Sequence, residues 1–228
     1  MNVLEPALAG RPLDRPLLAP RFAALAAEVD ELPLEAFLAD LGRRARIYAD
    51  LARSLRVDVL IVNDADEAPD VLADLLRRAR AVVPEPTLLG VTVTGPATAA
   101  AATGEPLATA TRGVIAAARS AAEAGAGVVF VVESGEAPEG YARAVTPLWG
   151  SLKFFRAVGV LQAPWAADVR GPVLPCVTAP LERPHALAVA PRDGSPPGST
   201  AALITHTEDL AGHVPVRELQ SAVARLRP

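Results

Sequence analysis

The sequence predicts an α/β fold with parallel strands, and two observations lead to this prediction. Four short apolar runs alternate along the chain with stretches of helical periodicity, which is the pattern of parallel β/α units. Hydrophobic residues make up 51% of the chain and aromatic residues only 4%, so the apolar content is mostly Ala, Leu and Val. That composition suits strands buried on both faces. Units of this kind build either a closed β/α barrel or an open sheet.

The first part of the chain precedes this alternation. Residues 1–20 are rich in Pro, and we expect them to form an extended segment on the surface. Residues 21–55 show helical periodicity, and Pro33 is expected to divide them into two helices. Residues 21–228 are then expected to form a single domain.

The alternating elements begin at residue 57. The predicted strands cover residues 57–63, 87–95, 127–134 and 160–164. The helices between them cover residues 68–83, 97–126 and 139–159. Pro69 suits the first turn of the first helix, whereas Gly104 and Pro106 are expected to interrupt the second and Pro147 to bend the third.

The pattern changes after residue 170. Three more strands are predicted at residues 171–177, 185–191 and 200–206, followed by a closing helix at 215–226. The links between these strands are too short and too rich in Pro to be helices, whereas a parallel pair needs a crossover of a dozen residues or more. We therefore expect a reduced second half, with either antiparallel strands or an open barrel.

Polar side chains follow several of the predicted strands. Right-handed crossovers place the carboxyl ends of parallel strands on one edge, where the chemistry of such folds is found. We therefore expect these side chains to share a rim that binds a small molecule. The candidate catalytic residues are Asp64, Asp66, Glu133 and His206, and the candidate substrate-binding residues at the same edge are Asn63, Thr94 and Trp165.

The carboxylates have a second interpretation. Acidic residues that follow a strand also stand at the start of the next helix, where they complement the helix dipole and cap its first amides. Asp64, Asp66 and Glu133 could therefore be caps, site residues or both. If Asp64 and Glu133 meet across the rim, each shifts the pKa of the other, which suits acid–base work.

Composition excludes several classes of function. The net charge is −4 and no basic block stands out, so we expect no nucleic-acid partner. A single Cys allows no intrachain disulfide, which fits a reducing cytoplasm. The start of the chain lacks the pattern of a signal peptide, and no apolar run reaches about 18 residues, so no membrane association is expected.

Four segments resemble segments of one known family, and they follow one another in the order that they have in that family. They are "VDVLIVNDAD", "LLGVTVTGPATAAAATG" with a Gly-Pro-x-Thr turn, the stretch 124–159 with its Pro, Leu and Lys pattern, and "ALITHTEDLAGHVPVRELQSAVARL". They are similar to the uroporphyrinogen decarboxylase superfamily, which includes corrinoid-linked methyltransferases. The resemblance covers residues 35–160 and 200–226 and implies a β/α barrel with its active site at the strand carboxyl ends.

The resemblance also implies roles for several residues. In the decarboxylases an acid at the end of the first strand binds the pyrrole N–H groups, a place that Asp64 or Asp66 matches, and His206 lies near a His used at the last strand. Arginines in an N-terminal segment hold the substrate's carboxylates, and here Arg11 and Arg15 are the candidates.

The expected function follows from this likeness. We expect a carbon–carbon lyase, a decarboxylase acting on a carboxylated small molecule or tetrapyrrole-like substrate as in porphyrin biosynthesis, with no organic cofactor. No metal is expected either, because "LQAPWAAD" lacks the His-x-Cys of the methyltransferase branch and Cys176 cannot replace a thiolate-rich site alone. The alternatives are methyl transfer and a non-catalytic protein that binds a ligand or partner. A homodimer or a partner chain would cover the shortened half of the barrel.

Overall fold

The structure is a computed structural model of the 228-residue chain. It describes residues 4, 17–21, 23–63, 67–163, 173–176, 203–205, 216–217, 220–221 and 224. The chain divides into two compact units, which are described one at a time. The first unit comprises residues 1–62, 74–89 and 178–228, and the second comprises residues 63–73 and 90–177.

The first unit contains a buried strand that sequence analysis did not predict. Strand β1 (Leu17–Ala19) pairs in parallel with β7 (Leu203–Thr205), with Leu18 opposite Ile204. All three β1 residues are buried, and the buried Asp58 carboxylate accepts a hydrogen bond from the Leu18 amide at 2.9 Å. The expectation of a surface segment is therefore wrong for these three residues.

Three helices and a strand follow β1 in the first unit. Helices α2 (Ala23–Val29), α3 (Leu34–Ala39) and α4 (Leu41–Leu55) replace the two that were expected. Pro33 separates α2 from α3 as predicted, and Asp40 adds a second break by capping α4, where its side chain accepts from the Arg43 amide. Strand β2 (Val59–Ile61) is fully buried, and the Asp58 carbonyl accepts from the Leu88 amide.

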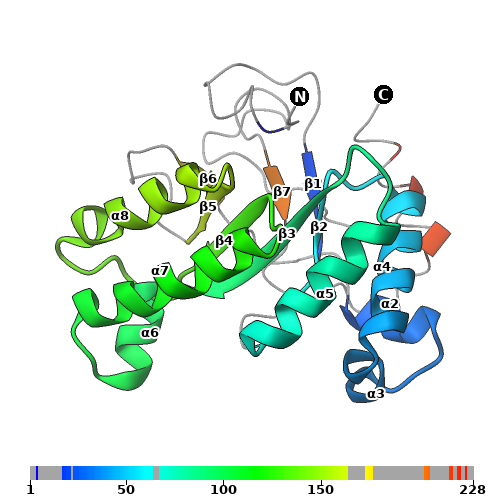
Figure 1. Ribbon diagram of the computed structural model, residues 1–228, viewed down its shortest axis with the longest axis horizontal. Coiled ribbons are helices and arrows are strands. Elements are labelled where there is room, and N and C mark those ends of the chain that lie inside the picture. Colours follow the sequence, from blue (N-terminus) through cyan, green and yellow to red (C-terminus); the bar gives the residue numbers. More distant parts are fainter. Residues whose placement is uncertain are drawn as a thin grey trace. The chain divides into compact units, whose positions relative to one another are not determined.

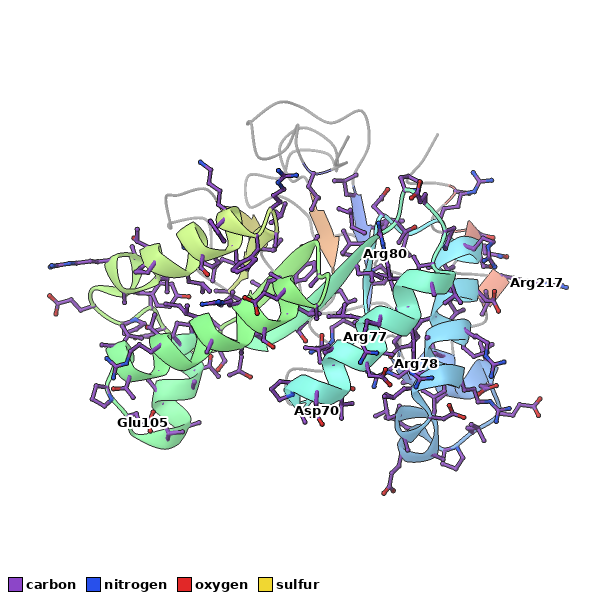
Figure 2. The ribbon with its side chains drawn as sticks, in the orientation of Figure 1. Asp70, Arg77, Arg78, Arg80, Glu105 and Arg217 are labelled. Atoms are coloured by element: carbon purple, nitrogen blue, oxygen red, sulfur yellow. The ribbon has the colours of Figure 1, made fainter. Side chains whose placement is uncertain are left out.

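Helix α5 (Pro69–Val82) confirms the helix that was predicted at residues 68–83, and it is amphipathic. Its apolar face is buried, whereas Arg77, Arg78 and Arg80 are exposed (Figure 2). Asp74 forms ion pairs with Arg77 and Arg78 one turn away, an arrangement that supports a helix only weakly. Pro69 occupies the first helical position, as predicted.

The second unit is built on parallel strands joined by helices. Strand β3 (Leu88–Thr94) runs into this unit and pairs with β4 (Val128–Val132), which pairs with β5 (Val158–Gln162), which pairs with β6 (Val173–Cys176). The connections are α6 (Pro96–Thr103), α7 (Leu107–Glu123) and α8 (Tyr141–Phe154), and α7 and α8 lie side by side (Figure 1).

These elements confirm most of the predicted alternation. The break at Gly104 and Pro106 separates α6 from α7, and Gly104 ends α6 in the left-handed conformation that favours glycine. The pairings of β6 with β5 and of β7 with β1 are parallel, so neither strand takes the antiparallel alternative. The strand expected at residues 185–191 lies outside the described residues, while residues 216–217, 220–221 and 224 of the closing helix are helical. Among the described residues, no helix is both long and apolar enough to cross a membrane.

Candidate functional site

The carboxyl ends of β3, β4 and β5 place three residues in one row. Thr94 is paired in register with Val132, and Val132 with Gln162. Residues paired in this way on parallel strands share a face of the sheet. Thr94 and Val132 are half-buried, whereas only 2% of Gln162 is exposed.

The packing of α8 identifies the face on which this row lies. A Cβ atom added to Gly159 would come within 2.8 Å of the Trp149 ring on α8, so Gly159 faces that helix. Side chains alternate along a strand, and Gln162 is three residues further on. Gln162, Val132 and Thr94 therefore lie on the face of the sheet that points away from α8. In β/α barrels this is the inner face, and its carboxyl-terminal end is where ligands bind.

Glu133 follows β4 and turns toward the helices instead. The residue is buried, and Oε1 accepts a hydrogen bond from the Ala97 amide at 2.9 Å. Oε2 accepts from the amide and the hydroxyl of Thr98, both at 2.8 Å. Ala97 and Thr98 stand in the first turn of α6, so the carboxylate caps that helix at its positive end.

Gly95 explains how Glu133 approaches α6 so closely. Gly95 is the N-cap residue of α6 and has no side chain with which to cap the helix itself. A Cβ atom at this position would overlap the Glu133 side chain. The Gly-Pro-x-Thr turn thus leaves room for a carboxylate from the neighbouring strand to serve as the cap.

Two side chains, those of Thr98 and Tyr141, lie next to the carboxylate of Glu133. The Thr98 hydroxyl also accepts from the Ser134 amide at 2.7 Å, which ties the end of β4 to α6. Tyr141, at the start of α8, is also buried. Burial, and then the nearby Glu133 carboxylate, raise the pKa of the Tyr141 phenol well above its ordinary value. Tyr141 therefore stays protonated at neutral pH.

Asn63, at the end of β2, uses its carboxamide to extend the sheet. Its Oδ1 accepts from the Thr92 amide at 2.8 Å, and its Nδ2 donates to the Thr92 carbonyl at 2.9 Å. The Thr92 hydroxyl donates to the Asn63 carbonyl at 3.2 Å. The side chain thus takes the place of a peptide group beside β3. The contact of Asn63 with substrate, which the sequence predicts, stays a prediction.

Gln162 is a candidate site residue that sequence analysis did not name. Its side chain is buried, yet neither Oε1 nor Nε2 has a hydrogen-bond partner among the described residues. A buried donor or acceptor left without a partner costs about 1–3 kcal/mol. The available signal was its place in "VGVLQ", where a polar residue ends an apolar strand just as Glu133 follows β4.

The remaining predicted site residues belong to the part of the chain that the structure does not describe. They are Asp64, Asp66, Trp165, His206, Arg11 and Arg15. Glu133 and Thr94 both stand at strand ends as predicted, but Glu133 points to the helices and Thr94 lies on the opposite face. Within the described part of the chain, no group of three or more His, Cys, Asp or Glu side chains could hold a metal ion.

Comparisons with known proteins bear on the fold. No protein family matches the chain by sequence profile, and no curated protein matches it. The structure is similar to that of a methyltransferase from Methanosarcina mazei, with a TM-score of 0.65 and 14% identity over 97% of this chain and 96% of the other. A dihydrodipicolinate synthase family protein from Coccidioides immitis has a TM-score of 0.48 and 15% identity over 85% of this chain and 67% of its own. The chain has an α/β fold of the β/α-barrel kind.

Proposed function

We propose that this protein is an enzyme that binds a carboxylated small molecule at the carboxyl ends of its barrel strands and removes a carboxyl group from it. The observation that supports this proposal most is the row formed by Thr94, Val132 and Gln162. It brings the half-buried Thr94 and the buried carboxamide of Gln162 onto the face away from α8, two strands apart. A few convergent polar groups in an otherwise apolar setting are typical of a small-molecule site.

The proposed reaction is a carboxy-lyase reaction. An electron-rich ring accepts a proton, the bond to the carboxyl carbon breaks, and carbon dioxide leaves while its electron pair restores the ring. Asp64 or Asp66 would stabilise the positive charge of the protonated ring. His206 is the better candidate to move the proton, because both oxygens of Glu133 already accept hydrogen bonds from α6.

The test is release of carbon dioxide from uroporphyrinogen and from a panel of carboxylated pyrroles. We expect the wild-type protein to release carbon dioxide from at least one of them. The variants Asp64→Asn, Asp66→Asn and His206→Ala should show which groups the reaction needs, with a loss of about 100-fold for a general acid. If the wild-type protein releases no carbon dioxide from any of them, the lyase proposal is wrong.

Methyl transfer is a second candidate, favoured by the similarity of the whole fold to a methyltransferase. Because fold alone does not establish function, the two candidates must be separated by their products. A methyltransferase would move a methyl group between methylcobalamin and a thiol, and mass spectrometry would detect the methylated thiol. That product without carbon dioxide release would favour the second candidate over the first.

The proposal extends to assembly. A second copy of the chain or another protein would cover the shortened half of the barrel, as the sequence predicts. Analytical ultracentrifugation across a range of concentrations tests the homodimer. A single species with the 23.6 kDa mass of one chain at every concentration would contradict it.

A further inference from the structure

We propose that Gln162 recognises the ligand by pairing its carboxamide with an N–H group and an oxygen acceptor that lie side by side on that ligand. The inference rests on the proposed function, because it takes the rim of the barrel to be a small-molecule site. It adds the chemical class of the group that this site selects. No other side chain in the described part of the chain combines such deep burial with two unpartnered polar atoms.

Gln162 differs in its hydrogen bonding from the other buried polar side chains at strand ends. Asn63 and Glu133 are also buried polar side chains at strand ends, and each has hydrogen-bond partners for both of its terminal atoms. Gln162 has none among the described residues, although only 2% of it is exposed. Buried polar groups in proteins are nearly always paired, so one without a partner among the described residues calls for a further partner, which we assign to the ligand.

Gln162 is also fixed in position at the carboxyl end of β5. The backbone of Gln162 is held in place, because its carbonyl accepts from the Glu133 amide at 2.9 Å and β5 is paired on both sides. The side chain lies on the face away from α8, at the end of the strand where β/α-barrel proteins bind ligands. The half-buried Thr94 lies in the same row, two strands away, and adds a hydroxyl to the same rim.

The carboxamide of Gln162 is complementary to one kind of ligand group. The carboxamide offers an acceptor at Oε1 and two donors at Nε2, held in one plane. An ionised carboxylate alone satisfies Nε2 and leaves Oε1 facing negative charge. A group with an N–H beside an oxygen satisfies both atoms at once, as a lactam, a primary amide or a pyrrole that carries a carboxylate would. A site that is built to hydrogen-bond an N–H strongly rejects the analogue that lacks it.

Two probes of nearly the same shape test this inference on the full chain. Pyrrole-2-carboxylate has an N–H next to its carboxylate, and furan-2-carboxylate has a ring oxygen at that position. We expect the wild-type protein to bind the pyrrole about tenfold more tightly in titrations followed by NMR. In Gln162→Leu the two affinities should differ by less than about threefold. Gln162→Met, with an unbranched side chain of similar length, gives the same readout if the leucine variant does not fold.

Trp149→Phe is the matched control. The indole Nε1 of Trp149 is also buried without a partner among the described residues, but the ring packs against Gly159 on the other face of β5. This variant should keep the tenfold preference for the pyrrole. The inference is overturned if the wild-type protein binds neither probe or binds both equally, if Gln162→Leu keeps the preference, or if Trp149→Phe loses it.

The binding titration and the carbon dioxide assay fail independently of each other. Selective binding of the pyrrole that depends on Gln162, without carbon dioxide release from any substrate, would support the recognition site and reject the lyase. Carbon dioxide release with no preference between the probes would support the lyase and reject the role of Gln162.

Discussion

The ends of β4 and β5 are adjacent in the sheet and carry buried polar side chains with opposite hydrogen-bonding states. Glu133 faces the helices, and its two oxygens accept three hydrogen bonds from the first turn of α6. Gln162 faces the other side, and neither of its terminal atoms has a partner among the described residues. We therefore expect the polar side chain to serve the fold at Glu133 and a ligand at Gln162, which lies on the other face.

The comparison predicts its largest effect at Glu133. Glu133→Leu removes the carboxylate and leaves two amides and a hydroxyl of α6 without their acceptor. We expect a loss of about 3 kcal/mol in the free energy of unfolding, measured by urea denaturation. Glu133→Gln keeps the shape and one acceptor, so it should lose about half as much. A leucine variant as stable as the wild-type protein would show that Glu133 is not a structural cap.

A smaller effect is expected at Asn63, which carries the same functional group as Gln162 but has partners. Asn63→Ala removes the side-chain bonds to the backbone amide and carbonyl of Thr92. We expect a loss of about 2 kcal/mol in the same denaturation experiment. Asn63→Asp should also destabilise the protein at neutral pH, because a carboxylate oxygen would then face the Thr92 carbonyl. A negligible loss in Asn63→Ala would show that these two hydrogen bonds do not stabilise the fold.

The smallest effect is expected at Tyr141 and depends on pH. Burial and the Glu133 carboxylate raise the pKa of this phenol in the folded state above the value of about 10 that it has when unfolded. The folded protein then holds the proton more tightly, so its stability should fall as the pH rises above about 10. Tyr141→Phe should flatten this alkaline decrease in the free energy of unfolding. If the free energy of unfolding falls with pH equally steeply in the two proteins, the raised pKa of Tyr141 is contradicted.

Much of the fold could be predicted from the sequence because each strand and its following helix repeat the same pattern. An apolar run, a polar break and an amphipathic stretch mark each pair, so β2 to β5 and the helices between them were predicted within a few residues. The strand β1 was missed because Leu17–Ala19 is a short apolar run after a Pro-rich segment. Its partner β7 lies at the other end of the chain, and local sequence does not reveal such a distant pairing.

The site was less predictable than the fold. Sequence spacing correctly placed Glu133 at a strand end, but the face that it occupies depends on the Gly95 turn and on the position of α6. Gln162 was overlooked because an isolated Gln at the end of an apolar strand carries no motif. What distinguishes it is the lack of a hydrogen-bond partner among the described residues, which only the three-dimensional packing shows.

The most direct test of this account compares Glu133→Leu with Gln162→Leu in the ligand-free protein. Both variants replace a buried polar side chain at the end of one strand with the same apolar residue. We expect the first to lose about 3 kcal/mol in the free energy of unfolding. The second should lose nothing or gain about 1 kcal/mol, because it removes a buried amide that has no partner among the described residues. Equal losses in the two variants would show that the fold itself satisfies Gln162, which would contradict its role on a ligand-binding face.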